Sequence, residues 1–506
     1  MELENRLRKR TLWVRTKSEA VEGQTTEEGE PPVGEPVSPS ARLVECCFIV
    51  IQLGLTVPVN PSTWRTGIAA KIASHPRFTS IQARDKEGVV RWVRTSVDLD
   101  YHIIYPRLGV ELQMANPDKA VEDYVASLPS KPMDHCRPLW EFHVLDFPTS
   151  EAAASVVMRV HHSLSDGTSL LMLLLSSTRS AADPTKPPAM PPLPARSGLI
   201  YSPPPPPPLS AGALAFLAWL WSLLLLAWNT MWDLASFLAI ILFRKDTHTI
   251  FTATINHDHC TQRKRIVHTS LSLDDVKFVK DAINCTVNDV LVGVTDAALS
   301  RYYYRKSGDT ETCKRIRFRS ILPVNLRAPT ALHACVNMIE SGKGSAVKWG
   351  NQVGFIILPV HIAMHNDPLD YIRKAKNIMN MKKNSLEALS TYMVAELFHK
   401  IFGWKAGAAI IHRMVSHTTM LLSNMIGPVE QVELFGHPLA FIAPSQHGIA
   451  QAINVNYQSY VNTVRLVLAV DEAQFPDCYH LLDDFAESLR RIKDAATSIV
   501  QHNSKA

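Results

Sequence analysis

This chain of 506 residues lacks the features of a disulfide or zinc framework. Its eight cysteines are scattered, and no two of them have CxxC spacing; they lie at positions 46, 47, 136, 260, 285, 313, 335 and 478. This usage is typical of reduced thiols in a cytosol-facing protein. Basic residues near the N-terminus are not followed by an apolar run, so we expect no cleavable signal peptide.

The chain also lacks a strong charge of either sign. Charged residues make up 20% of it and the formal net charge is +5, so we expect no nucleic-acid partner. Small basic clusters at 6–10, 244–245 and 263–265 suit a solvated surface, and the last two also suit anionic lipid headgroups, because they follow an apolar segment. A hydrophobic content of 46% is ample for the two or three domains that this length predicts.

Composition divides the chain into five segments. Residues 1–34 are polar and rich in Glu and Thr, which predicts a disordered tail. Residues 35–183 and 264–506 alternate short apolar runs with helical patterns, which predicts two α/β domains. Between Pro184 and Pro208, 12 of 25 residues are proline, which predicts a stiff, extended linker over 184–208.

The fifth segment, 209–243, has one charge in 35 positions, Asp233, and four of the ten tryptophans. We expect it to associate with a membrane; a buried core helix is the alternative. If residues before and after it build one site, both must lie on the same side of the membrane. We therefore expect a re-entrant hairpin that turns near 229–233, or an interfacial segment, instead of a single crossing.

Residues 161–167, His-His-Ser-Leu-Ser-Asp-Gly, are the most informative stretch. The β-branched run before them predicts a strand, and the leucine-rich run after them predicts a helix. Histidine is suited to take a proton near neutral pH. We expect Asp166 to brace the loop through a salt bridge and Gly167 to permit a sharp exit turn. A structural histidine is the simpler alternative, and no further Cys or His follows at metal-ligand spacing, so no metal is expected.

The stretch resembles the HHxxxDG signature of the CoA-dependent acyltransferase superfamily. Further segments resemble its wax ester synthase/diacylglycerol acyltransferase family, in the plant-type branch. They are 35–43, 137–141 (Arg-Pro-Leu-Trp-Glu), 287–291 (Val-Asn-Asp-Val-Leu), 323–327 (Pro-Val-Asn-Leu-Arg), 350–354 (Gly-Asn-Gln-Val-Gly) and 423–428 (Ser-Asn-Met-Ile-Gly-Pro). Each is weak alone, and their order makes them specific. The absence of an Asp-Phe-Gly-Trp-Gly motif near the C-terminus argues against the BAHD acyltransferases.

The resemblance implies an α/β fold of two chloramphenicol acetyltransferase-like domains with a central tunnel. It implies transfer of a fatty acyl group from acyl-CoA to a long-chain fatty alcohol, with diacylglycerol as a second acceptor. Acyl-CoA is then a substrate, and no cofactor is expected. Membrane lipid is the remaining partner, at the endoplasmic reticulum with the active site facing the cytosol, or at the plasma membrane.

The resemblance also assigns roles to residues. His162 matches the general base of the family, and His161, Asp166 and Gly167 would hold its loop. Asn288, at a predicted helix N-terminus, is our candidate donor to the oxyanion. The residues expected to bind substrate are Pro138, Leu139, Trp140 and Asp289.

Two other functions stay open. The first is another acyltransferase of the superfamily with a soluble alcohol or amine acceptor, which the apolar segment argues against. The second is a non-catalytic membrane scaffold that keeps the fold, which the intact histidine motif argues against.

Overall fold

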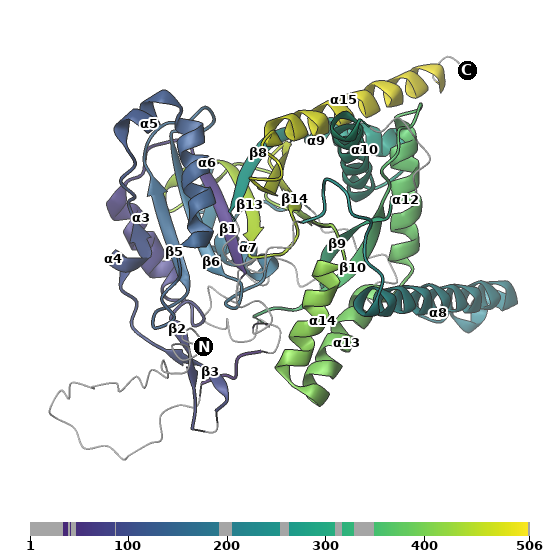
Figure 1. The fold of residues 1–506 in the computed structure, drawn as a ribbon, viewed down its shortest axis with the longest axis horizontal. Helices are drawn as coiled ribbons and strands as arrows, with labels where there is room; N and C mark the ends of the chain where they lie inside the picture. The colour runs from purple at the N-terminus through teal and green to yellow at the C-terminus, as the bar shows by residue number, and fades with distance from the viewer. Residues whose placement is uncertain are drawn as a thin grey trace.

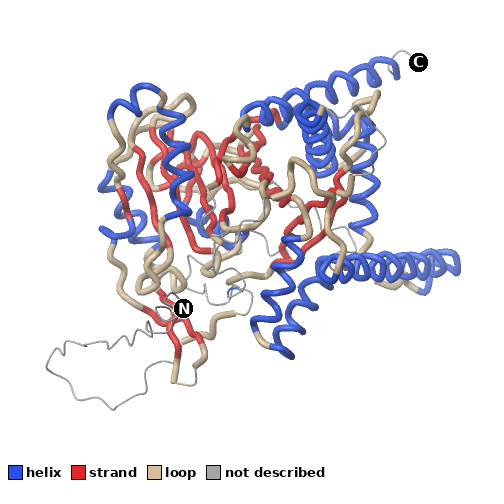
Figure 2. The backbone as a smooth tube through the Cα atoms, viewed as in Figure 1, coloured by secondary structure: helices blue, strands red, loops and turns tan. Residues whose placement is uncertain are grey.

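The computed structural model describes residues 34–38, 41, 47–86, 88–191, 205–253, 263–308, 316–327 and 349–503. Two β-sheets meet in the middle of the molecule, and helices cover their outer sides (Figures 1 and 2). The predicted disordered tail lies almost wholly outside the described residues, as does the middle of the predicted proline linker.

The first sheet has the strand order β4-β5-β6-β1-β13-β12-β7. Its strands are β1 (Phe48–Leu55), β4 (Ile103–Ile104), β5 (Trp140–Leu145), β6 (Ala154–His161), β7 (Thr178–Ser180), β12 (Val432–Leu434) and β13 (His437–His447). A separate hairpin is formed by β2 (Ser80–Arg84) and β3 (Val90–Arg94). The helices of this half are α3 (Pro61–Gly67), α4 (Leu99–His102), α5 (Val110–Ala115), α6 (Pro117–Ser127) and α7 (Gly167–Ser177).

The second sheet has the order β10-β9-β11-β14-β15-β8. Its strands are β8 (Lys264–Ser272), β9 (Phe318–Asn325), β10 (Val353–Val360), β11 (Met420–Met425), β14 (Ile453–Tyr460) and β15 (Thr463–Asp471). The helices of this half are α9 (Leu273–Ile283), α10 (Val287–Ser307), α12 (Leu369–Lys383), α13 (Glu387–Phe402), α14 (Trp404–Ser416) and α15 (Cys478–Asn503). Helices α9, α10, α12 and α15 bury the largest apolar core against this sheet.

The predicted division of the chain at residue 264 is crossed by two strands. Strands β12 and β13 lie in the C-terminal part of the chain but belong to the first sheet, where β13 pairs antiparallel with β1. β13 also packs against β14 and β15 of the second sheet. Local sequence patterns do not reveal such a pairing, because its two strands are hundreds of residues apart. Strand β13 therefore joins the two halves, because it follows β11 of the second sheet in the sequence but pairs in the first sheet.

The local elements around the histidine motif are confirmed. β6 ends at His161, and α7 begins at Gly167, with Asp166 as its N-cap. All five leucines of α7 are buried, and three of them belong to the core of the first half. The motif therefore forms a short loop between a buried strand and a buried helix.

The apolar segment forms one continuous helix, α8 (Gly212–Leu242), so the predicted hairpin is wrong. Polar side chains near the expected turn contact the body of the protein instead. Asn229 Nδ2 donates to the Asn384 carbonyl at 3.0 Å, and Thr230 Oγ1 accepts from the Leu386 N–H at 3.0 Å. Asp233 is buried and pairs with Lys382 at 2.7 Å. With these side chains satisfied by neighbours and no glycine or proline between them, nothing interrupts the helix.

Lys382 lies between two carboxylates, because it also donates to Glu387 at 2.8 Å. Burial raises the pKa of Glu387 to about 7, although the Lys382 ammonium opposes this shift. The three charges join α8 to α12 and α13 in a poorly solvated place. Because the Lys382 ammonium pairs with both carboxylates, removing it leaves two buried carboxylates without a positive charge.

We predict that Lys382→Met lowers the free energy of unfolding by about 3–5 kcal/mol, the usual cost of breaking a buried ion pair. Chemical denaturation in detergent solution measures the change. Lys119→Met is the matched control, because Lys119 is exposed on α6 and should shift stability by less than about 0.5 kcal/mol. Equal stability of the two variants would contradict the role of this cluster.

Candidate active site

The histidine loop is held by both halves of the molecule. The His162 N–H donates to the Cys47 carbonyl at 2.8 Å, next to β1. From the other half, Asn351 Nδ2 donates to the His162 carbonyl at 3.0 Å, and Trp349 Nε1 donates to the Leu164 carbonyl at 2.9 Å. Asn351 belongs to the 350–354 segment that the sequence singles out. The loop therefore takes its shape only where the two halves meet.

His161 is buried and supports the loop from within. Its Nδ1 lies 2.6 Å from Ser163 Oγ, which also accepts from Gln82 Nε2 at 2.8 Å. The His161 ring packs edge-on against Phe48, its register partner on β1. These contacts fix the end of β6 from which His162 projects.

His162 is half-buried, and burial lowers the pKa of its imidazole from the ordinary value of 6.5. The Asp166 carboxylate and the Asn351 side chain oppose that shift. Within the described residues, His162 Nδ1 is buried without a hydrogen-bond partner. A neutral imidazole with such a nitrogen has the properties of a general base at neutral pH.

Asp166 forms the salt bridge expected of it, with Arg327 at 2.8 Å. The side chains of both residues are at least nine-tenths buried. Asp166 Oδ1 accepts from the Ser169 N–H at 2.8 Å, which caps α7, and Oδ2 accepts from the Gln352 N–H at 3.1 Å. Arg327 also donates to the Gly350 carbonyl. One carboxylate therefore caps α7 and binds two segments of the second half.

Gly167 does not have the role that we expected. Its φ is not among the positive values of the described residues, so no left-handed turn requires glycine here. A Cβ at this position would lie 3.6 Å from Met425 Sδ, on β11. This is an ordinary contact distance, and Gly167 is one of the residues that line the cavity beside α7.

Asn288 and Asp289 lie in the first turn of α10. Asp289 forms a capping box with Thr286: the Thr286 N–H donates to Asp289 Oδ2 at 2.8 Å, and the Asp289 N–H donates to Thr286 Oγ1 at 3.3 Å. Asn288 is exposed and accepts from Asn424 Nδ2, next to Met425 on β11. No hydrogen bond among the described residues joins Asn288 to the histidine loop. Its role toward an oxyanion stays a prediction.

Pro138, Leu139 and Trp140 are buried beneath the histidines. The His161 N–H donates to the Leu139 carbonyl at 2.9 Å. Trp140 Nε1 donates to the Phe78 carbonyl at 2.8 Å, and its ring stacks on His102. The segment braces the histidine strand. Pro138, Leu139 and Trp140 are not among the residues that line the cavity beside α7. Their contact with substrate stays a prediction, as does that of Asp289.

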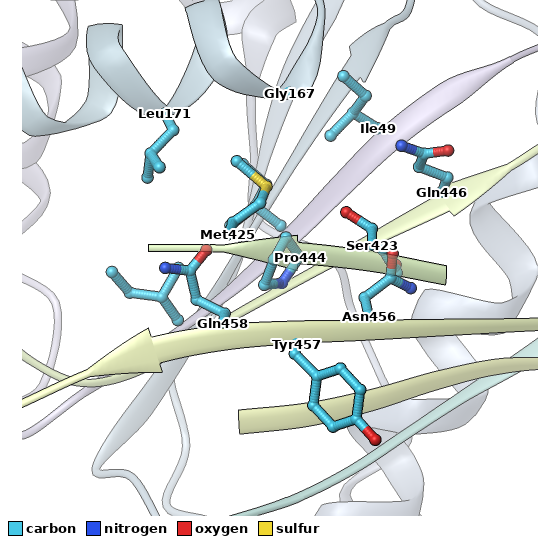
Figure 3. A pocket seen from close by; sticks show the side chains of 13 residues that line it. Ile49, Gly167, Leu171, Ser423, Met425, Pro444, Gln446, Asn456, Tyr457 and Gln458 are labelled. Atoms are coloured by element: carbon cyan, nitrogen blue, oxygen red, sulfur yellow. The ribbon is translucent and has the colours of Figure 1, made fainter. Parts of the chain in front are cut away.

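A cavity opens between the two sheets beside α7 (Figure 3). Its empty space is about 450 Å³, part of it open to solvent. It is lined by Ile49, Ile51, Gly167, Leu171, Ser423, Met425, Ile442, Pro444, Ser445, Gln446, Asn456, Tyr457 and Gln458. The cavity reaches the histidine loop at Gly167, and the His162 ring is not part of its lining. A tunnel through the molecule stays a prediction.

Two polar residues of the cavity were not expected from the sequence. Asn456 Nδ2 and Gln458 Oε1 are buried without a hydrogen-bond partner among the described residues. They lie two positions apart on β14 and so face the same side. Amides at alternating positions of an otherwise apolar strand are a signal that sequence reading could have used. Both atoms are free to bind a polar group that enters the cavity.

Two family models match the chain. The model described as "Wax ester synthase/diacylglycerol acyltransferase catalytic domain" matches residues 65–291, and that described as "WS/DGAT C-terminal domain" matches residues 349–493. Among curated proteins, wax ester synthase/diacylglycerol acyltransferase 4 of Arabidopsis thaliana is 39% identical over 479 residues, 92% of this chain and 90% of the relative. Number 6 of the same plant is 36% identical over 513 residues, 95% and 98% of the two chains.

Solved structures agree on the fold. The wax ester synthase/diacylglycerol acyltransferase of Marinobacter aquaeolei VT8 matches with a TM-score of 0.57 and 18% identity, over 92% of this chain and all of that one. The first condensation domain of the calcium-dependent antibiotic synthetase matches with a TM-score of 0.54 and 12% identity, over 92% and 97%. The predicted two-domain α/β fold is therefore confirmed.

We predict that Asp166→Ala lowers the free energy of unfolding by about 3–5 kcal/mol and lowers the yield of folded protein, because it strands the buried Arg327 guanidinium. Asp166→Asn should cost less, since the amide oxygen still caps α7. Chemical denaturation measures both variants.

The double variant Asp166→Ala/Arg327→Met tests the pairing itself. It should recover part of the loss of the single variants, because no charge is then left unpaired. Strictly additive losses would contradict a direct interaction between the two side chains.

Proposed function

Because the chain belongs to the wax ester synthase/diacylglycerol acyltransferase family, we propose that His162 is the base of its acyl transfer from acyl-CoA to alcohols and to diacylglycerol. The alcohol is a long-chain fatty alcohol, and the product is a wax ester; with diacylglycerol, the product is triacylglycerol. The observation that carries this proposal is the clamped loop that holds His162 where the two halves meet.

In the proposed reaction, a ring nitrogen of His162 accepts the hydroxyl proton as the alcohol oxygen attacks the thioester carbonyl. The tetrahedral intermediate collapses by breaking its C–S bond, and the departing CoA thiolate takes the proton from the imidazolium. The balance is one ester and one CoA thiol per turnover. Attack by the alcohol itself requires no acyl-enzyme, metal or cofactor, so the proposal includes none.

The neighbouring residues act on this step by position. His161 and Asp166 hold the loop, and Gly167 lines the cavity. Asn288, which accepts from Asn424 Nδ2 on β11, is the proposed donor to the oxyanion. Such a donor typically contributes about 10²–10³ in turnover.

The substrates favour a membrane location for this enzyme. Acyl chains and long alcohols partition into bilayers, and α8 is the one helix among the described residues that is long and apolar enough, by length and composition, to cross one. We place the protein on the endoplasmic reticulum membrane with its site facing the cytosol, and the plasma membrane is the alternative. Membrane lipid is then a partner, and nucleic acid is not.

We predict that His162→Ala reduces acyl transfer by about 10²–10⁴ while the protein stays folded, because the alcohol loses its base. Labelled acyl-CoA is supplied with hexadecanol or with diacylglycerol, the lipid product is identified, and circular dichroism checks the fold. His480→Ala is the control, since His480 is exposed on α15.

Each outcome of this assay decides between functions. Wild-type turnover by His162→Ala would contradict the base. Transfer only to soluble alcohols or amines would favour the first alternative function, and no consumption of acyl-CoA by the unsubstituted protein would favour the scaffold.

The pH profile gives a second test. Because burial lowers the pKa of His162, its ring stays neutral as the pH falls through 6.5, and kcat/KM should decline only at more acidic pH. Asp166→Asn should move this acid limb further toward low pH, since the carboxylate raises the His162 pKa. An acid limb at or above 6.5 in the unsubstituted protein would contradict the assignment.

A further inference from the structure

Helix α8 exposes apolar side chains along its whole length. Those of one outer stripe recur every three or four residues from Leu214 to Trp228, and Leu242 follows two heptads later, which places them on one side of a helix. The stripe consists of Leu214, Leu217, Trp221, Leu224, Trp228 and Leu242. Trp221 and Trp228 are 63% and 64% exposed. No described residue covers this stripe, so the helix offers an extended apolar surface.

The opposite side of α8 is docked on the body only in its second half. Leu226, Asp233, Phe237 and Ile240 are its buried residues. Phe237 and Ile240 pack with α14 and with Ile321 of β9 and Ile357 of β10. Figure 1 shows the first half of α8 extending away from α13 and α14.

These dimensions disfavour a membrane crossing by α8. The undocked part, from Gly212 to Leu225, would be about 21 Å long, whereas the bilayer core is about 30 Å thick. A crossing would therefore draw the docked half into hydrocarbon, together with Lys382 and its two carboxylate partners. Charges at that depth are costly. A helix lying along the surface keeps them with the body.

Basic side chains gather where the stripe ends. Arg244 and Lys245 follow α8 directly, and Arg317 Nη1 donates to the Lys245 carbonyl at 3.2 Å. The N–H of Asp246, the next residue, donates to the His417 carbonyl at 3.2 Å, one turn after Arg413. These four basic residues are exposed, and Asp246 is engaged by Arg319. The cluster is therefore positive, which complements anionic lipid headgroups.

We propose that α8 lies in the plane of an anionic phospholipid leaflet, with its outer stripe in the acyl chains and this basic cluster at the headgroups. The proposal deepens the membrane association of the proposed function and rests on it. Helix α13 extends the contact with further exposed apolar side chains, which are Met393, Leu397, Phe398, Ile401 and Phe402. Both halves of the molecule then stay on one side of the membrane.

The first experiment is flotation of the full chain with phosphatidylcholine vesicles, with or without phosphatidylserine. Binding should increase with phosphatidylserine. Trp221→Glu/Trp228→Glu should weaken it by at least about tenfold, and Arg244→Glu/Lys245→Glu should remove the preference for phosphatidylserine. Met114→Glu is the matched control, because Met114 is 82% exposed on α5, at the far end of the molecule (Figure 1).

The second experiment measures depth. A fluorescent label is attached to a cysteine at Leu214 or at Leu238, and lipids quenching at known depths are added; the labelled unsubstituted protein gives the background. An in-plane helix places both labels at the same depth. A crossing helix separates them toward opposite faces, which would overturn the proposal.

Other outcomes are equally decisive. Loss of self-association in Trp221→Glu/Trp228→Glu, with no vesicle binding by the unsubstituted protein, would assign the stripe to a second copy of the chain and overturn the lipid assignment. Acyl transfer in detergent micelles is followed in parallel. Normal acyl transfer without vesicle binding would overturn the proposed lipid-binding surface and leave the proposed function intact. Vesicle binding without acyl transfer would overturn only the proposed function.

Discussion

The carboxylate of Asp166 and the guanidinium of Arg327 meet where the two halves of the molecule join, and both are withdrawn from water. Each half contributes one of the two charges, so neither charge has this partner without the other half. An unpaired charge that is buried so deeply is costly. Because the same carboxylate caps α7, the pair ties the start of that helix, and hence the histidine loop, to β9 and β10. The shape of the site is thus a property of the assembled molecule.

The sequence predicted what local chemistry determines. The strand before the histidines, the leucine-rich helix after them and the capped start of α10 follow from patterns within about ten residues, and the structure contains all three. The pairing of Asp166 was expected, but its partner was not, because Arg327 lies 161 positions along the chain. The sharing of β13 between the halves was missed for the same reason: antiparallel register across hundreds of residues leaves no local trace.

Two errors have a common origin. A hairpin was expected to turn near 229–233, yet Asn229 binds the Asn384 carbonyl between α12 and α13, and Asp233 binds Lys382 in the last turn of α12. Gly167 was expected to permit a sharp turn because glycine allows unusual backbone angles, but its place is on the wall of the cavity, in contact distance of Met425. In both cases a residue was interpreted through its own backbone, whereas tertiary neighbours set its role.

The pairing of β13 with β1 in the first sheet has a consequence for biosynthesis. Once β1 has left the ribosome, one long side of it has no strand to pair with until β13 is made, because β13 begins about 380 residues after β1. At roughly 5–20 residues per second, synthesis leaves that edge open for roughly 20–80 seconds. Open apolar edges recruit other strands. A product truncated before β13 would keep this edge of β1 unpaired, which makes it an aggregation hazard.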